Sequence, residues 1–214
     1  MSDGHRVWNR CRIRQRRVRL CLRRGVQGMN VIPSIYVASL TDYNCGRLHG
    51  VWIDLGAGVD SDDVMNQIVE MLADSPAVRF GEDWIAEEWA IHDHEGFEGY
   101  KVSEYHDLGE VMEAAEAIEQ HGEPMALWLS LPDRSVADAI TSFNDAFRGV
   151  WESPEDWAND EFREIYSEVV AVMDECGYLT FNADYYITEA QSNGGVQFER
   201  TANRCVAVFD TCSV

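Results

Sequence analysis

The sequence predicts an α+β fold with a sheet-bearing start, a helical middle and a sheet-bearing end. Three observations lead to this prediction. Segments rich in β-branched and aromatic residues stand near the start and the end of the chain, helical periodicities fill the middle, and no internal repeat or long linker interrupts them. With 214 residues, 46% of them hydrophobic, the chain can bury a substantial core in one domain or a few small ones.

The first sheet is predicted from three extended segments. Residues 32–40 are rich in β-branched and aromatic residues and run into the turn-forming TDYNCG. Residues 47–56 then resume an extended pattern, so we expect a hairpin. Acidic residues at the start and apolar residues on one face predict a helix over 60–76 that Pro76 ends. Residues 82–96 are the third expected strand.

The middle of the chain is predicted to be helical. Asp107 is a suitable N-cap and Gly122 a suitable stop for a helix over 107–120. After a short turn at Pro124, residues 133–143 predict another helix. These segments would stand between the two sheets.

The last long helix has a clear start signal, with Ser153 as its cap and Pro154 at its first position, and we expect Gly177 to end it. Strands should then close a second small sheet. They are expected in residues 178–188, 194–201 and 204–210.

Charge is distributed unevenly along the chain. It has 17 basic and 38 acidic residues, for a net charge of -21, but nine arginines and a single acid, Asp3, stand in residues 1–30. Residues 31–214 therefore keep 8 basic and 37 acidic residues, a net of -29, and Lys101 is the only lysine. Such a body repels nucleic acid and acidic membranes and favours a basic surface, such as that of a DNA-binding protein, as its partner.

The arginine-rich start is a basic arm that binds nucleic acid or folds back on the acidic body, or an unstructured extension. We favour a basic, disordered extension over 1–29, with translation beginning naturally at Met29. No apolar run approaches the roughly 18 residues of a membrane span. Six cysteines without CxxC spacing favour free thiols in a reducing cytoplasm.

Two predicted helices carry carboxylates in lines that face water. In one helix they recur every four residues, and in the other every three, on a different face from the apolar Val111 and Ile118. Each like-charge pair costs roughly 0.2 to 0.5 kcal/mol, where lysine would have stabilised the helix. The carboxylates expected to form a partner-binding surface are Glu87, Glu88, Glu110, Glu113, Glu116, Glu119, Asp156, Asp160, Glu164 and Glu168.

Three interpretations fit these lines: an ordinary solvated surface, adaptation to high salt, and mimicry of the charge of DNA. The mean charge density of a body of this size is about one third of that of a duplex. Mimicry therefore requires the carboxylates to gather on one face.

Few residues are arranged for catalysis. His92, Asp93, His94 and Glu95 have the donor types that a metal needs, but the two histidines on one strand face lack an evident third ligand. The GxSxG and GxxxxGK[ST] motifs are absent. We expect no enzyme, no metal and no cofactor. An acidic metal-dependent hydrolase using this HDHE segment remains the alternative from a different class.

Tryptophans on a surface can stack against single-stranded bases, but such a site needs a basic groove beside them. Because the sequence offers none in the acidic body, core packing is the expected role. The tryptophans concerned are Trp52, Trp84, Trp89, Trp128, Trp151 and Trp157.

The stretch IYVASLTDYNCGRLHGVWIDLG, residues 35–56, resembles the opening of the ArdA family of antirestriction proteins, with its DYNxGRLHG-type turn and WID-type strand. EEWAIHDHEGF (87–97) and FRGVWESPEDWANDEF (147–162) are similar to further family segments, so the resemblance covers about residues 32–175. Residues 176–195 show no clear equivalent of the family's antirestriction motif, which is linked to dimer contacts. The motif residues expected to serve the fold are Asp42, Tyr43, Asn44, Gly46, Arg47, Leu48, His49, Gly50 and Trp52.

The resemblance implies an elongated fold of three small units in a row: an N-terminal antiparallel sheet with a helix (30–99), a central helical bundle (100–144) and a C-terminal sheet with a long helix (145–214). It implies a DNA mimic of mobile genetic elements that is not a catalyst and is usually a homodimer. Such a protein occupies the DNA-binding site of type I restriction-modification enzymes in the bacterial cytoplasm. A mimic aimed at a different DNA-binding protein is the alternative.

Overall fold

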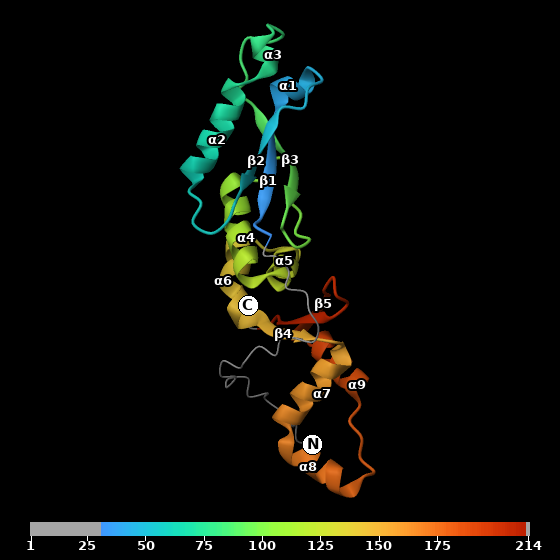
Figure 1. Ribbon diagram of the computed structural model, residues 1–214. Coiled ribbons are helices and arrows are strands. Elements are labelled where there is room, and N and C mark those ends of the chain that lie inside the picture. The colour runs from blue at the N-terminus through green and yellow to red at the C-terminus, as the bar shows by residue number, and fades with distance from the viewer. Residues whose placement is uncertain (1–30, 213–214) are drawn as a thin grey trace, which may run out of the picture.

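The computed structural model describes residues 31–212 and shows a mixed α+β protein with two small antiparallel sheets, which confirms the predicted fold class (Figure 1). The expectations for residues 1–29 lie outside the described residues. Sheet A has β1 (Ser34–Ser39) in its middle, flanked by β2 (Gly50–Asp54) and β3 (Trp89–Glu95).

The predicted hairpin is confirmed, because β1 and β2 pair antiparallel with Ser34 opposite Asp54. As the central strand, β1 is buried along almost its whole length. The third strand is shorter than expected: it begins at Trp89, and residues 82–88 are irregular. Its pairing with β1 shifts register between Tyr36 and Val37, as at a β-bulge.

Three helices accompany sheet A: α1 (Leu40–Asn44), α2 (Ser61–Ala73) and α3 (Pro76–Arg79). The predicted TDYNCG turn is helical in its first part, because the Ser39 side chain caps α1 by accepting from the N–H of Asp42. Pro76 starts α3 and does not end α2, since proline fits the first turn of a helix.

The central helices are α4 (Leu108–His121), α5 (Glu123–Leu129) and α6 (Val136–Ala146). The predicted caps of α4 are confirmed: the Asp107 side chain accepts from the N–H of Glu110, and Gly122 stands at the C-cap with φ 68°. The expected turn at Pro124 is the short helix α5.

Sheet B has β6 (Val206–Asp210) in its middle, between β4 (Phe147–Trp151) and β5 (Val196–Arg200). The two strands predicted in 194–201 and 204–210 are confirmed. We did not predict β4, because its FRGVW sequence continues directly from α6 without a turn signal.

The C-terminal helices are α7 (Pro154–Ile165), α8 (Ser167–Cys176) and α9 (Ala183–Ser192). Ser153 caps α7 and Gly177 caps α8 in the left-handed conformation, as expected. The prediction of one unbroken helix is wrong, because Tyr166 (φ -114°, ψ 41°) leaves the helical conformation. The predicted strand over 178–188 is also wrong.

The first residues of the segment 178–188 lead into α9. The Asn182 side chain caps this helix by accepting from the N–H of Tyr185. A helix suits this segment because Tyr186 and Ala190, four residues apart, both pack against the buried side chains of α7 and β6.

One hydrophobic core runs through sheet A, the central helices and one face of sheet B. It includes Ile35 of β1, Val111 of α4, and Ala207 and Phe209 of β6. A second cluster, with Val206, Val208 and Trp157, lies on the other face of sheet B against α7 and α9. Because side chains alternate along a strand, β6 feeds both clusters and is buried on both faces.

Figure 1 shows sheet A with α2 and α3 at one end of the molecule, α4 to α6 in the middle, and α7 to α9 at the other end. Within the described residues, no helix is long and apolar enough to cross a membrane. Cys45, Cys176, Cys205 and Cys212 form no disulfide with one another, whereas Cys11 and Cys21 lie outside the described residues.

Candidate acidic interface

Three of the four predicted glutamates of α4, namely Glu110, Glu113 and Glu116, are exposed. We call them the α4 ridge. Glu119 is half-buried, and its carboxylate accepts from the backbone N–H of Ala57 at 2.6 Å. Residues three apart on an α-helix are rotated by about 60°, so a line of four turns through about half a circle. The predicted line therefore bends away from one face, and its last member tethers the loop after β2.

The helix α4 nevertheless buries the face that its sequence predicts. Val111, Ala115 and Ile118 are buried, while Leu108 and Met112 pack partly buried against the same core. The ridge thus stands opposite the packed face and points to solvent.

On α7 the exposed carboxylates are Asp156, Asp160 and Glu164, which we call the α7 ridge. The expected line of four on one helix is wrong, because Glu168, although exposed, belongs to α8 beyond the break at Tyr166. Two ridge residues also have local partners. Ser153 Oγ donates to Asp156 Oδ2 at 2.8 Å, and Trp151 Nε1 donates to Asp160 Oδ2 at 3.2 Å.

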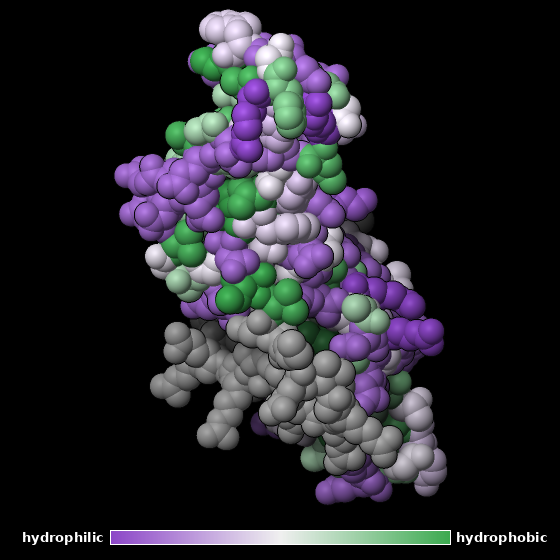
Figure 2. Space-filling model, turned by 45° about the horizontal axis from the view of Figure 1, so that its top comes forward, coloured by the Kyte–Doolittle hydropathy of each residue, from purple (hydrophilic) through white to green (hydrophobic). Residues whose placement is uncertain are grey.

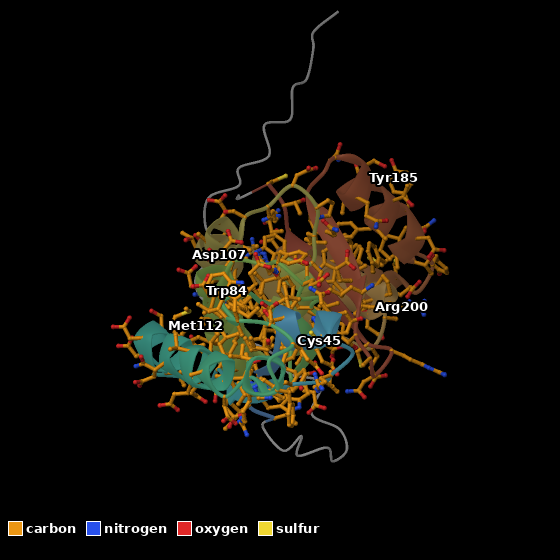
Figure 3. The ribbon with its side chains drawn as sticks, turned by 90° about the horizontal axis from the view of Figure 1, so that it is seen from above. Cys45, Trp84, Asp107, Met112, Tyr185 and Arg200 are labelled. Carbon is orange, nitrogen blue, oxygen red and sulfur yellow. The ribbon has the colours of Figure 1, made fainter. Side chains whose placement is uncertain are left out.

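Glu87 and Glu88 are exposed in the irregular segment before β3. The backbone carbonyl of Glu88 accepts from the N–H of Leu40 at 3.0 Å, which fixes this segment against α1. Seen from above, side chains that end in oxygen project around much of the periphery of the molecule (Figure 3). The predicted carboxylates are therefore spread over several elements, and the gathering on one face that mimicry requires is seen within each ridge and not across all ten.

Four of the eight basic side chains among the described residues are engaged within the protein, and the other four, Lys101, Arg163, Arg200 and Arg204, are exposed. Arg47 pairs with Glu82, Arg79 with Asp74, and Arg148 with Asp210. The guanidinium of Arg134 lies 3.7 Å from the ring centroid of Trp128. Most carboxylates are exposed, and Asp42 alone among those described is buried. None of these four contacts involves a carboxylate of either ridge, and His106 Nε2 lies 3.3 Å from Glu110 Oε2.

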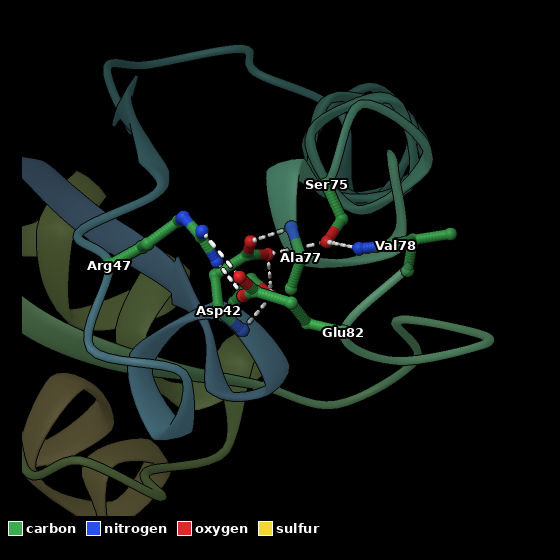
Figure 4. Close-up of polar contacts among 7 residues, drawn as sticks. Asp42, Arg47, Ser75, Ala77, Val78 and Glu82 are labelled. Carbon is green, nitrogen blue, oxygen red and sulfur yellow. Dashed lines mark hydrogen bonds and ion pairs between the residues drawn. The ribbon is translucent and has the colours of Figure 1, made fainter. Parts of the chain in front are cut away.

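The motif segment at 42–50 forms a polar network at the end of sheet A, which Figure 4 shows. Asp42 is fully buried, and its Oδ2 accepts from Ser39 Oγ and Ser75 Oγ, both at 2.7 Å. Its Oδ1 accepts from the N–H of Ala77 at 2.8 Å. Burial raises the pKa of Asp42, but the hydrogen bonds from Ser39, Ser75 and Ala77 and the nearby His49 together leave it below its ordinary value.

Other motif residues extend this network. Arg47 holds Glu82 through two contacts, its guanidinium lies 5.3 Å from the ring centroid of Phe80, and His49 Nε2 is 2.8 Å from the carbonyl oxygen of Met71. A Cβ at Gly50 would lie 2.3 Å from the carbonyl oxygen of Val37, so no larger residue fits. These contacts join α1 and the hairpin to α2 and α3.

The remaining motif positions are less engaged. Tyr43 and Leu48 are exposed, and Asn44 and Gly46 lie in the exposed turn that ends α1. Trp52 is 43% exposed, with its ring 5.5 Å from that of Tyr36.

A protein-family model described as "Antirestriction protein (ArdA)" matches residues 35–202. The chain belongs to the ArdA family. The match confirms the resemblance seen in the motif segments. It also extends past residue 175, so it includes the segment for which the sequence suggested no clear equivalent. A search of curated proteins found no match.

ArdA proteins are non-enzymatic antirestriction proteins, which confirms that the chain is not an enzyme. His92 Nε2 lies 4.0 Å from Glu104, and the His94 ring contacts Phe97. In the part of the chain that the structure describes, no three His, Cys, Asp or Glu side chains are grouped to hold a metal. The geometry gives the hydrolase alternative no support.

The expectation that the tryptophans are core residues is confirmed for Trp128 and Trp157 and wrong for Trp84, which is 84% exposed. Trp89 and Trp151 are half-buried. Trp84 was expected within a strand over 82–96. The strand begins only at Trp89, so Trp84 lies in the irregular segment 82–88 and does not pack in the sheet. The sequence did hold a signal for this exposure, since Trp84 stands among acidic residues in a segment without clear periodicity.

Proposed function

We propose that this ArdA protein inhibits type I restriction-modification enzymes by occupying their DNA-binding site with a surface that mimics the phosphate charge of B-DNA. The observation that carries the proposal is the excess of exposed negative charge: most carboxylates are exposed, whereas the described residues include only eight basic side chains, four of which are held in internal contacts. Inside a bacterial host, the protein would protect incoming mobile DNA from cleavage.

The mimic surface of this proposal consists of the nine exposed carboxylates among the ten expected from the sequence, with the α4 ridge and the α7 ridge as its main parts. These ridges stand on helices of the central and C-terminal units, in an elongated arrangement of three units. Such an arrangement spaces negative charge along the body as a duplex spaces phosphates. Glu87 and Glu88 extend the surface towards α1. Glu119 contributes through the shape of the loop that it holds.

Binding gains free energy when carboxylates replace the phosphates that a basic cleft normally holds. The ions condensed around the cleft and around the inhibitor are then released, so affinity falls as salt rises. A phosphate-like surface carries no base-specific information, so one inhibitor can act on enzymes with different recognition sequences.

The test is cleavage of an unmodified plasmid by a purified type I enzyme with increasing amounts of inhibitor. We expect inhibition near stoichiometric amounts at low salt. The double variant Glu113→Gln, Glu116→Gln should require several-fold more protein for half-inhibition. The matched control is Asp63→Asn, Glu70→Gln, which removes the same charge from exposed positions of α2.

Equal inhibition by both double variants would contradict the assignment of the α4 ridge. No inhibition by a large excess of folded wild-type protein would contradict the proposed target. Inhibition of an unrelated DNA-binding enzyme would then point to the alternative mimic.

We also propose that the protein forms a homodimer through α8. This helix buries no side chain, and its Val169 and Val172 are 46% and 55% exposed, next to Ile165 at the end of α7. An unpartnered apolar stripe of this kind is typical of a protein-protein contact.

A further inference from the structure

Four large apolar or aromatic side chains are exposed at the end of the molecule that α1 and α3 form. Tyr43 is 57% exposed, Phe80 70%, Leu48 76% and Trp84 84%. We call them the tip cluster. Figure 1 shows α1 and α3 together at this end, and Figure 2, which brings it forward, shows hydrophobic side chains among hydrophilic ones.

The backbone beneath the tip cluster is held in place. Asp42 ties α1 to α3 through Ser75 and Ala77. The N–H groups of Glu82 and Asp83 both donate to the carbonyl oxygen of Ala77, which fixes the chain just before Trp84. The side chains are thus presented on a supported frame while they remain outside the core.

Phe80 is positioned without being buried. The Arg47 guanidinium lies over its ring, and two contacts with Glu82 hold this guanidinium in place. An aromatic ring fixed in solvent has lost conformational freedom without the gain from burial, which makes it a low-cost anchor for a partner.

The surroundings of the tip cluster define the chemistry of its partner. Residues 40–49 and 74–88 contain six acidic residues and two arginines, and both arginines are paired with carboxylates. A second copy of the chain would bring like charges together at this end. A basic surface with an apolar hollow fits it.

We propose that the tip cluster is an apolar anchor, led by Trp84, that inserts into a hollow within or beside the basic DNA-binding surface of the target enzyme. The inference rests on the proposed function and adds to it a contact that DNA phosphates do not make. Tryptophan is one of the residue types enriched among the few side chains that dominate the binding energy of protein interfaces. The anchor supplies the part of the affinity that salt does not weaken.

Apolar and ionic contacts leave different signatures in a salt series. Removal of an ionic contact flattens the dependence of log Kd on log salt, because fewer ions are released. Removal of an apolar contact weakens binding about equally at every salt concentration, because burial of apolar surface releases no condensed ions.

The experiment measures the Kd of the full-length protein for a purified, DNA-free type I enzyme over a range of potassium chloride. We expect Trp84→Ala to raise Kd by about 10- to 100-fold at every concentration, with an unchanged salt slope. Trp84→Phe should retain part of the affinity. Tyr185→Ala is the matched control, since Tyr185 is also an exposed aromatic residue, at 67%, but lies on α9 at the other end. It should bind like wild type.

Wild-type affinity of Trp84→Ala, in a series where the wild type itself binds, overturns the anchor and leaves the proposed function intact. Failure of the wild type to bind is failure of the proposed function. Sedimentation of the free proteins tests other occupants: if Trp84→Ala changes the oligomeric state, the tip contacts a second copy. If deletion of residues 1–28 abolishes the effect of Trp84→Ala, the basic N-terminal segment occupies it. Either result overturns the proposal.

Discussion

At the scale of single residues, the contacts of Asp42 explain why the DYNCGRLHG segment has an aspartate at this position. A buried carboxylate is costly unless it is fully hydrogen-bonded, and Asp42 accepts from two hydroxyls and one backbone N–H. Two of these donors, on Ser75 and Ala77, lie 33 and 35 residues further along the chain. No local pattern predicts such partners, so only the family resemblance indicated that this residue matters.

We expect Asp42→Asn to destabilise the protein by about 2 kcal/mol, because the amide replaces a charged acceptor with a neutral one and directs its NH₂ at other donors. Chemical denaturation at pH 7 measures the change, with the exposed Asp63→Asn as control. The same pair tests pH dependence.

The folded-state pKa of Asp42 is lowered. The folded protein therefore binds fewer protons there than the unfolded chain does, and the stabilisation is complete above the unfolded pKa of about 3.9. It is lost as pH falls through that value and the lower folded value. The stability difference between wild type and Asp42→Asn should shrink as pH falls below about 4. A difference that stays constant would contradict this account.

At the scale of elements, the C-terminal helices show the limits of local patterns. Cap signals predicted the start of α7 and the end of α8, since these depend on neighbouring residues. The break at Tyr166 has no Pro or Gly to announce it. It accompanies tertiary packing, in which the Phe162 ring contacts Tyr166 and stacks on Phe181 at 4.0 Å.

The same limit applied to α9 and to the acidic lines. The β-propensity of YLTFNADYYIT predicted a strand, but packing of Tyr186 and Ala190 beneath the helix prevails over propensity. Helical periodicity predicted the exposure of seven carboxylates, Glu110, Glu113, Glu116, Asp156, Asp160, Glu164 and Glu168. The tether from Glu119 to Ala57 depends on a loop 62 residues away and did not.

The unpartnered stripe of α8 gives a prediction at this scale. Val169→Glu with Val172→Glu should convert a homodimer to a monomer, because each substitution puts a charge into an apolar contact. The melting temperature of the monomeric fold should change little, since α8 buries no side chain. Sedimentation equilibrium together with thermal melting measures both. A wild-type monomer, or a dimer that persists in the variant, would show that the contact lies elsewhere.

At the scale of the whole molecule, a core that extends from sheet A into sheet B supports a surface on which exposed carboxylates far outnumber exposed basic side chains. Composition alone predicted that the partner surface is basic, because residues 31–214 carry a net charge of -29. Composition did not predict that Trp84 is exposed, because the exposure of a side chain depends on which helices and strands pack against it.

The most direct test of the central claim is competition between this protein and DNA for one site. A fluorescent duplex bound to a purified type I enzyme is titrated with the inhibitor at several duplex concentrations, and anisotropy reports displacement. If the two occupy the same site, displacement is complete and the half-displacing concentration rises in proportion to free duplex. A ternary complex, or a half-displacing concentration that does not depend on duplex, would contradict the account.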